Sequence, residues 1–280
     1  NPQLRPEQPS EELPAGLQEF APAHPIELDK QLFGDVLRQC RRGQSGGVFG
    51  SRYEYFKTCL EEDTSFDALF NVAQRLARAD IPASIVDALR ISAMTALLKP
   101  NMHIRGICAG DCLRRLVAKA LTQQKQTTLR NAVWPYNFGL SDRSGTDAAV
   151  HLLQYLTDEF PEKVVLSIDG IGAFDHVCRA RIFEQLPRQE DLHSLVPFVR
   201  LWYATQPQFL WSDSEGVRHM ITQGDGGEQG DALMPALFSL ALHPASERIR
   251  ALLPQGCYVF AYLDDVYVVC DRDQVVESLR

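Results

Sequence analysis

The sequence predicts an α+β fold in which helices pack against an antiparallel sheet that carries acidic residues at one end. Apolar runs of strand type end on acids at Val164–Asp169 and at Tyr258–Asp265, and segments with helical spacing lie before and between them. The chain has 280 residues, of which 45% are hydrophobic. It can therefore bury a large core and could hold two subdomains.

The first 25 residues contain six prolines among acids and glutamines. This composition is typical of a disordered linker from a longer protein. From Ile26 to Arg42 the apolar residues recur at nearly helical spacing, and Gly43 would stop the helix.

The rest of the chain alternates helix and strand patterns. Helices are predicted at Phe66–Ala79, Ala83–Ala93, Asp111–Arg130, Gly145–Glu159, Ala180–Leu186, Leu192–Thr205 and Leu233–Leu252. Strands are predicted at Thr95–Lys99, Val164–Asp169, Gln208–Trp211 and Val217–Ile221, with a hairpin from Cys257 to Cys270. The order strand, helix, hairpin suits a ferredoxin-like arrangement.

Two adjacent carboxylates, Asp264 and Asp265, lie at the turn of the predicted hairpin. Two carboxylates about 4 Å apart repel by about 4 kcal/mol at an effective dielectric constant of 20, so a divalent cation opposite them is expected. Asp169 ends another strand and is a third candidate ligand. The alternative is a solvated turn and an ordinary strand end, since Asp is common in turns.

The residues around these acids form three motifs. Asp169-Gly170-Ile171-Gly172-Ala173-Phe174-Asp175 resembles polymerase motif A, and Tyr262-Leu263-Asp264-Asp265 resembles motif C of reverse transcriptases. Between them, the stretch from Gly227 to Phe238, with Gln229-Gly230-Asp231, resembles motif B. The segment that begins with Leu98-Lys99-Pro100 and ends at Lys119 is similar to the fingers segment of reverse transcriptases from non-LTR retrotransposons and group II introns. The resemblance covers residues 43 to 271.

This resemblance implies the fingers and palm of a right-hand polymerase, with an antiparallel, ferredoxin-like palm and the thumb absent. Residues 26–160 are expected to form mainly the fingers and residues 161–280 the palm, which ends soon after motif C. A thumb, and an endonuclease domain in a longer polyprotein, are expected to flank the chain.

The resemblance also implies RNA-directed DNA polymerase activity. Asp169, Asp264 and Asp265 would bind two Mg²⁺ ions, with Mn²⁺ as an alternative ion and the Gly170 carbonyl as a further ligand. A DNA primer on an RNA template would attack the α-phosphate of a dNTP through its 3′-hydroxyl.

Five further residues are predicted to bind the nucleotide. By resemblance, Lys99 and Arg105 would contact the triphosphate, and the ring of Phe174 would lie under the sugar and exclude a 2′-hydroxyl. An ordinary core phenylalanine is the alternative for Phe174. Gln229 and Gly230 would lie over the nascent base pair, where glycine permits a close backbone approach.

The charge distribution supports a nucleic-acid partner. The net charge is −8, yet from Lys99 to Arg130 the segment holds seven basic residues and one acid. A triphosphate and a template backbone both require such a surface. A solvated helix face explains Lys125 and Arg130.

Departures from the family pattern keep other functions open. The family usually has Lys or Arg at the position of Gly172, Pro at that of Gly106 and Ser at that of Met234. These differences allow a catalytically inactive relative that binds nucleic acid. A carboxylate-metal nuclease is a second alternative. Neither explains motif B.

Seven scattered cysteines indicate reduced thiols and an intracellular protein, and the resemblance suggests the nucleus. No apolar run reaches membrane-spanning length, so no membrane partner is expected.

Overall fold

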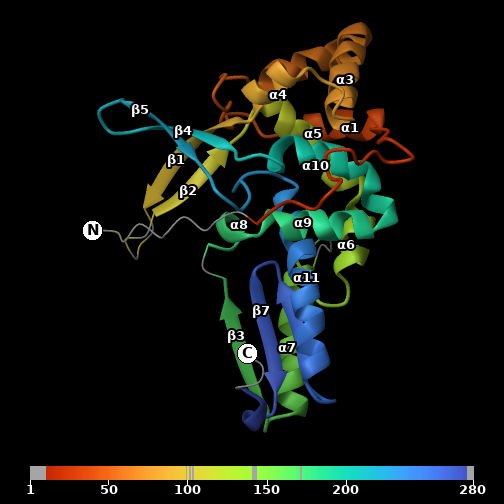
Figure 1. Cartoon of the computed structure of the whole chain (residues 1–280), viewed down its shortest axis with the longest axis vertical. Coiled ribbons are helices and arrows are strands. Elements are labelled where there is room, and N and C mark those ends of the chain that lie inside the picture. The colour runs from red at the N-terminus through yellow and green to blue at the C-terminus, as the bar shows by residue number, and fades with distance from the viewer. Residues whose placement is uncertain are drawn as a thin grey trace. The chain divides into compact units, whose positions relative to one another are not determined.

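The computed structural model describes residues 11–98, 100, 102, 104–140, 144–170 and 172–275 (Figure 1). The chain divides into two compact units, and each is built from two separate stretches of sequence. Unit 1 comprises Asn1–Gln124 and Phe174–Met234, and unit 2 comprises Lys125–Ala173 and Pro235–Arg280.

Unit 1 contains most of the helices that the structure describes. They are α1 (Lys30–Gln39), α2 (Tyr53–Lys57), α3 (Asp63–Ala77), α4 (Ala83–Leu89), α5 (Cys112–Gln124), α8 (Ala173–His176), α9 (Arg179–Gln185) and α10 (Val196–Tyr203). Short 3₁₀ helices are η1 (Thr58–Glu61), η2 (Leu186–Arg188) and η3 (Glu190–Leu195). The Asp29 side chain caps α1 by accepting from the Leu32 N–H at 2.8 Å, which explains why this helix begins later than Ile26.

The sheet of unit 1 has the order β2-β1-β4-β5. Its strands are β1 (Ile91–Leu98), β2 (Ile104–Ala109), β4 (Gln208–Ser212) and β5 (Arg218–Thr222). β1 runs parallel to β4, and the other two pairs are antiparallel. The prediction that the helix from Ala83 reaches Ala93 was wrong, because Ile91 pairs with Gln208 and begins β1. The strand β2 was not predicted.

Unit 2 is a three-stranded antiparallel sheet with helices on both faces. Its elements are α6 (Gln126–Val133), α7 (Gly145–Glu159), β3 (Val164–Asp169), α11 (Met234–Leu252), β6 (Tyr258–Tyr262), β7 (Asp265–Cys270) and the 3₁₀ helix η4 (Arg272–Gln274). The strand order is β3-β7-β6. The single helix predicted at Asp111–Arg130 is two helices, α5 and α6, which belong to different units.

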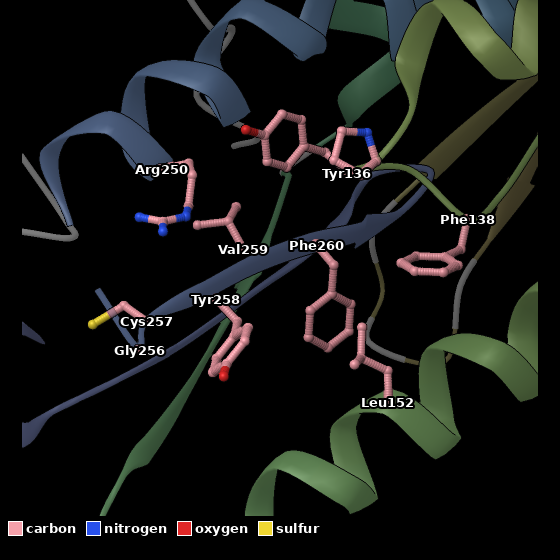
Figure 2. A pocket seen from close by; sticks show the side chains of 10 residues that line it. Tyr136, Phe138, Leu152, Arg250, Gly256, Cys257, Tyr258, Val259 and Phe260 are labelled. Atoms are coloured by element: carbon pink, nitrogen blue, oxygen red, sulfur yellow. The ribbon is translucent and has the colours of Figure 1, made fainter. Parts of the chain in front are cut away.

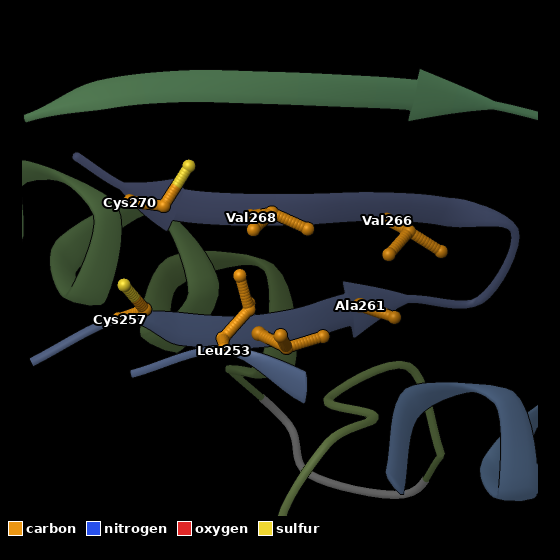
Figure 3. Close-up of a cluster of buried hydrophobic side chains, with 7 residues drawn as sticks. Leu253, Cys257, Ala261, Val266, Val268 and Cys270 are labelled. Atoms are coloured by element: carbon orange, nitrogen blue, oxygen red, sulfur yellow. The ribbon is translucent and has the colours of Figure 1, made fainter. Parts of the chain in front are cut away.

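Successive side chains along the strands of unit 2 point to opposite faces of the sheet, and they form one apolar cluster on each face. On one face Val259, Ala261, Val266 and Val268 pack with Leu242 and other residues of α11. Figure 3 shows Ala261, Val266 and Val268 of this cluster on the hairpin of β6 and β7. On the other face Phe260 and Val269 pack with Ala149 and Leu156 of α7. Burial on both faces explains why β6 and β7 read as nearly continuous apolar runs, and it confirms the predicted antiparallel sheet and mixed helix-and-strand content.

Residues 11–25 form part of the segment predicted to be a disordered linker. In the structure Leu17 is buried, and the Arg200 guanidinium on α10 donates to the carbonyl oxygens of Leu17, Gln18 and Phe20 at 2.6, 2.9 and 2.9 Å. The structure therefore places this part of the segment against α10.

Among the described residues, no helix combines the length and the apolar character that crossing a membrane requires.

Candidate active site

The hairpin of β6 and β7 holds the acid pair in a tight turn. Tyr262 pairs with Asp265 across the two strands, which leaves Leu263 and Asp264 as the loop. Leu263 has a φ of +55°, an uncommon value for a residue with a side chain. The turn therefore has a defined backbone conformation just before the two carboxylates.

The third acid lies directly across the sheet. Asp169, the last residue of β3, is the antiparallel partner of Asp265, the first residue of β7. Side chains that face each other in this way have Cβ atoms about 4.5–5.5 Å apart and share one face of the sheet. The register thus brings together the three acids that the sequence singled out, with Gly170 next in the chain.

The electrostatics of this end of the sheet favour a cation. A partial loss of contact with water raises the pKa of Asp265, and the negative charges of Asp264 and Asp169 raise it further. Asp169 and Asp265 are exposed and Asp264 is half-buried, so an ion from solvent can reach them. The carboxylates thus repel one another unless a positive charge lies between them.

The donor set suits a hard divalent cation, because carboxylate oxygens are the ligands that Mg²⁺ and Mn²⁺ prefer. Within the described ranges, however, no three His, Cys, Asp or Glu side chains are already arranged to hold a metal ion. Asp169, Asp264 and Asp265 thus suit a divalent metal ion by the chemistry of their side chains and by their places on the paired strands.

Four of the predicted nucleotide-binding residues, Arg105, Phe174, Gln229 and Gly230, belong to unit 1. Arg105 lies on β2, opposite Leu97 of β1, and is exposed. Lys99 falls outside the described residues. An exposed guanidinium at this hairpin is available to an anionic ligand.

The loop that resembles motif B packs against β2 and α8. The Cys108 N–H of β2 donates to the Gln229 carbonyl at 3.1 Å, and the Gln229 side-chain amide donates to Asp175 Oδ2 at 2.9 Å. The Gly227 N–H donates to the Phe174 carbonyl at 2.7 Å. The structure therefore brings Phe174, Gln229 and Gly230 together with β2, and Phe174 is half-buried, not a fully buried core residue.

Gly230 is a position that only glycine fits. Its φ is +130°, and a Cβ atom there would lie 2.3 Å from the Cys108 carbonyl oxygen. Because that oxygen belongs to the backbone of β2, it cannot move aside easily. Glycine at this position therefore allows the loop to approach β2 closely, and the predicted contact of Gly230 with the nascent base pair stays a prediction.

A buried ionic cluster lies beneath the same loop. Arg114 Nη1 lies 2.9 Å from Glu228 Oε1, and Nη2 lies 3.6 Å from Asp231 Oδ2. Ser92 Oγ donates to Glu228 Oε2 at 2.8 Å, and the Tyr203 hydroxyl donates to Asp231 Oδ2 at 2.5 Å. These acids flank Gln229 and Gly230, so the cluster holds both ends of the loop.

The burial of Arg114 corrects one expectation. The sequence counted Arg114 in the basic surface, but its side chain is buried and the Trp202 ring lies 4.4 Å from its guanidinium carbon. Burial alone would lower the pKa of Arg114, but the negative charges of Glu228 and Asp231 raise it, and Arg114 stays cationic. This arginine supports the loop and is not a ligand for phosphate.

A model of the family described as reverse transcriptase (RNA-dependent DNA polymerase) matches residues 97–280, about two thirds of the chain. The chain belongs to the reverse transcriptase family. A search of curated proteins found no match. The matched range contains all three motifs, the strand β3 and the hairpin of β6 and β7, which confirms the family that the sequence indicated.

Family membership implies RNA-directed DNA polymerase chemistry, a template and primer, dNTP substrates and divalent metal ions. The individual roles predicted for the site residues stay predictions.

Sequence reasoning missed two buried polar residues, the ion-paired Arg114 and Asn137. A helical-spacing signal could have found Arg114, since it lies three and seven residues before the buried Val117 and Leu121 on one face of α5. No signal pointed to Asn137, a buried polar residue between two aromatic ones.

Proposed function

We propose that this chain is the fingers and palm of an RNA-directed DNA polymerase that adds dNTPs to a DNA primer on an RNA template. The proposal assigns the β3-β7-β6 sheet to the palm and the β1-β2 hairpin to the fingers. The observation that carries it is the register that sets Asp169 opposite Asp265, with Asp264 adjacent.

Asp169, Asp264 and Asp265 would hold two Mg²⁺ ions, or Mn²⁺ in their place, with the Gly170 carbonyl as a further ligand. When bound, the ions would supply positive charge that activates the primer 3′-hydroxyl and stabilises the leaving pyrophosphate. The raised pKa of Asp265 supports this assignment, because bound cations would relieve the repulsion that contributes to it.

Five residues would bind the incoming nucleotide. Lys99 and Arg105 would contact the triphosphate, and the exposure of Arg105 supports this role. Phe174 would exclude a 2′-hydroxyl, while Gln229 and Gly230 would contact the nascent base pair. The exposed backbone of Gly230 supports a role in direct contact with a ligand.

We further propose that the chain comes from a retroelement of the non-LTR type, acts in the nucleus, and works with flanking thumb and endonuclease domains. The motifs from Lys99 to Lys119 support this origin.

The test is incorporation of dNTPs into a primer annealed to an RNA template in the presence of Mg²⁺. We expect Asp264→Asn to reduce incorporation by about 100-fold or more, because it removes charge stabilisation of several kcal/mol. Asp158→Asn on the exposed part of α7 is the matched control and should retain activity.

Two results would refute the proposal. A folded wild-type chain that binds template and primer yet incorporates no dNTP with either ion would be an inactive nucleic-acid-binding relative. Cleavage of nucleic acid without dNTPs, abolished by Asp264→Asn, would instead establish a nuclease.

A further inference from the structure

A short extended segment, Tyr136–Phe138, lies along the edge strand β6. The Phe138 N–H donates to the Ala261 carbonyl at 2.9 Å, and the Ala261 N–H donates to the Tyr136 carbonyl at 2.6 Å. These bonds form a parallel bridge between Asn137 and Ala261. The segment therefore acts as a short additional strand beside the hairpin that carries Asp264 and Asp265.

The two aromatic side chains of this segment pack on opposite faces of the sheet. Tyr136 packs with the cluster on the α11 face and Phe138 with the cluster on the α7 face, and both line an open apolar pocket of about 270 Å³ along β6 (Figure 2). Asn137, between them, is only 5% exposed. Tyr136 and Phe138 therefore anchor the segment from both faces of the edge strand, with Asn137 buried between them.

The Asn137 amide binds both backbone groups of Leu263. Its Oδ1 accepts from the Leu263 N–H at 3.3 Å and from the Gly139 N–H at 2.9 Å, and its Nδ2 donates to the Leu263 carbonyl at 3.2 Å. One side chain thus satisfies the donor and the acceptor of the residue that precedes the acid pair.

Leu263 needs such support because its φ of +55° is in the left-handed region, which is unfavourable for leucine. Gly139 contributes space, since a Cβ atom there would lie 2.6 Å from Leu263 Cγ and 2.8 Å from Leu263 N. The orientation of the Leu263 peptide groups determines where the chain enters Asp264. A relaxed turn would displace that carboxylate relative to Asp169 and Asp265.

We propose that Asn137 is a positioning residue for the metal-binding carboxylates: it holds Leu263 in the left-handed conformation and so sets the position of Asp264. This inference rests on the proposed metal-dependent function. Asn137 acts through the turn and does not touch the ion or the substrates.

The test is a titration of the full chain with Mn²⁺, in which electron paramagnetic resonance measures the free ion. We expect Asn137→Ala to weaken Mn²⁺ binding by about 10-fold or more, as is usual when a residue supporting a metal ligand is removed. Asn131→Ala is the matched control, because Asn131 is an exposed asparagine on α6 of the same unit. It should bind Mn²⁺ as the wild type does.

A rescue variant separates positioning from general stability. Glycine adopts positive φ without steric cost, so Leu263→Gly in the Asn137→Ala background should recover part of the lost affinity. A purely structural role for Asn137 predicts no recovery, since Leu263→Gly also removes an apolar side chain. A folded Asn137→Ala variant with wild-type affinity, or a loss that Leu263→Gly leaves unchanged, overturns the inference.

Hydrogen exchange on the wild-type chain gives a second test that does not depend on any variant folding. The Leu263 amide should exchange slowly, because its hydrogen is donated to a buried oxygen. Exchange at the rate of an open loop overturns the inference. If the wild type and Asp264→Asn bind Mn²⁺ equally weakly, the proposed metal site fails, whereas the exchange result still reports on Asn137.

Discussion

Replacing Arg114 with methionine should destabilise unit 1 severely. The substitution keeps an unbranched apolar side chain of similar length but removes the charge from a side chain that is 3% exposed. Glu228 and Asp231, at 2% and 4% side-chain exposure, would remain buried without their cation.

The expected magnitude follows from that burial. Removing one partner of a buried ion pair costs about 3–5 kcal/mol, because an uncompensated charge stays in the interior. The contact between the guanidinium and Trp202 is worth about 1–2 kcal/mol when desolvated, but it shares the same atoms and is not simply additive. We therefore expect the free energy of unfolding to fall by about 3–5 kcal/mol. This is a large part of the total for a domain, which is about 5–15 kcal/mol.

The assay is urea unfolding followed by tryptophan fluorescence, since Trp202 is buried beside Arg114. Arg38→Met is the matched control. Arg38 pairs with Asp35 at 2.8 Å on the surface, where both side chains are about half exposed, so its loss should cost below about 0.5 kcal/mol.

A triple variant tests the cause. Adding Glu228→Gln and Asp231→Asn to Arg114→Met removes the unpaired charges and should recover a substantial part of the stability. A loss below about 1 kcal/mol for Arg114→Met, or no recovery in the triple variant, would refute the reasoning from buried charge.

Two further predictions concern the same loop and strand. Gly230→Ala should cost about 1–3 kcal/mol and reduce dNTP incorporation, because a methyl group would meet the Cys108 carbonyl. Gly216→Ala, with φ of +81° and open space around it, separates backbone strain from this clash, and equal unfolding free energies for the two variants would contradict the prediction. Burial, reinforced by the charge of Glu228, raises the pKa of Cys108 from 9.0 to about 12, so iodoacetamide should label it far more slowly in native than in urea-unfolded protein. Between pH 9 and about 12 the native thiol keeps its proton while the unfolded thiol loses it. The contribution of Cys108 to stability should therefore be complete below pH 9 and fall as the pH rises towards 12. Equal labelling rates of native and unfolded protein at pH 8 would show that the thiol is accessible and contradict the prediction.

The sequence by itself predicted the elements that carry the acids. The apolar runs before Asp169 and around Asp264 and Asp265 have the composition of buried strands, and the acid pair interrupts the second run where a turn is required. The structure confirms both strands and the hairpin, since these features depend on residues close together in the chain. The sequence also identified the family, because three motifs in order carry more information than any one of them.

Local patterns misplaced several boundaries. Ile91 follows a helical pattern but joins a sheet, because pairing with Gln208 outweighs the local preference. The break between α5 and α6 likewise had no clear signal, although the two helices belong to different units.

Tertiary structure alone decided which polar side chains are buried and which groups bind them. Arg114 reads as part of a basic surface, yet Glu228 and Asp231, distant in sequence, compensate its charge in the interior. Asn137 gains its role only because β6 brings Leu263 beside it. The physical reason is that burying a charge or an amide is favourable only when specific partners satisfy it, and those partners come from parts of the chain that folding alone brings together.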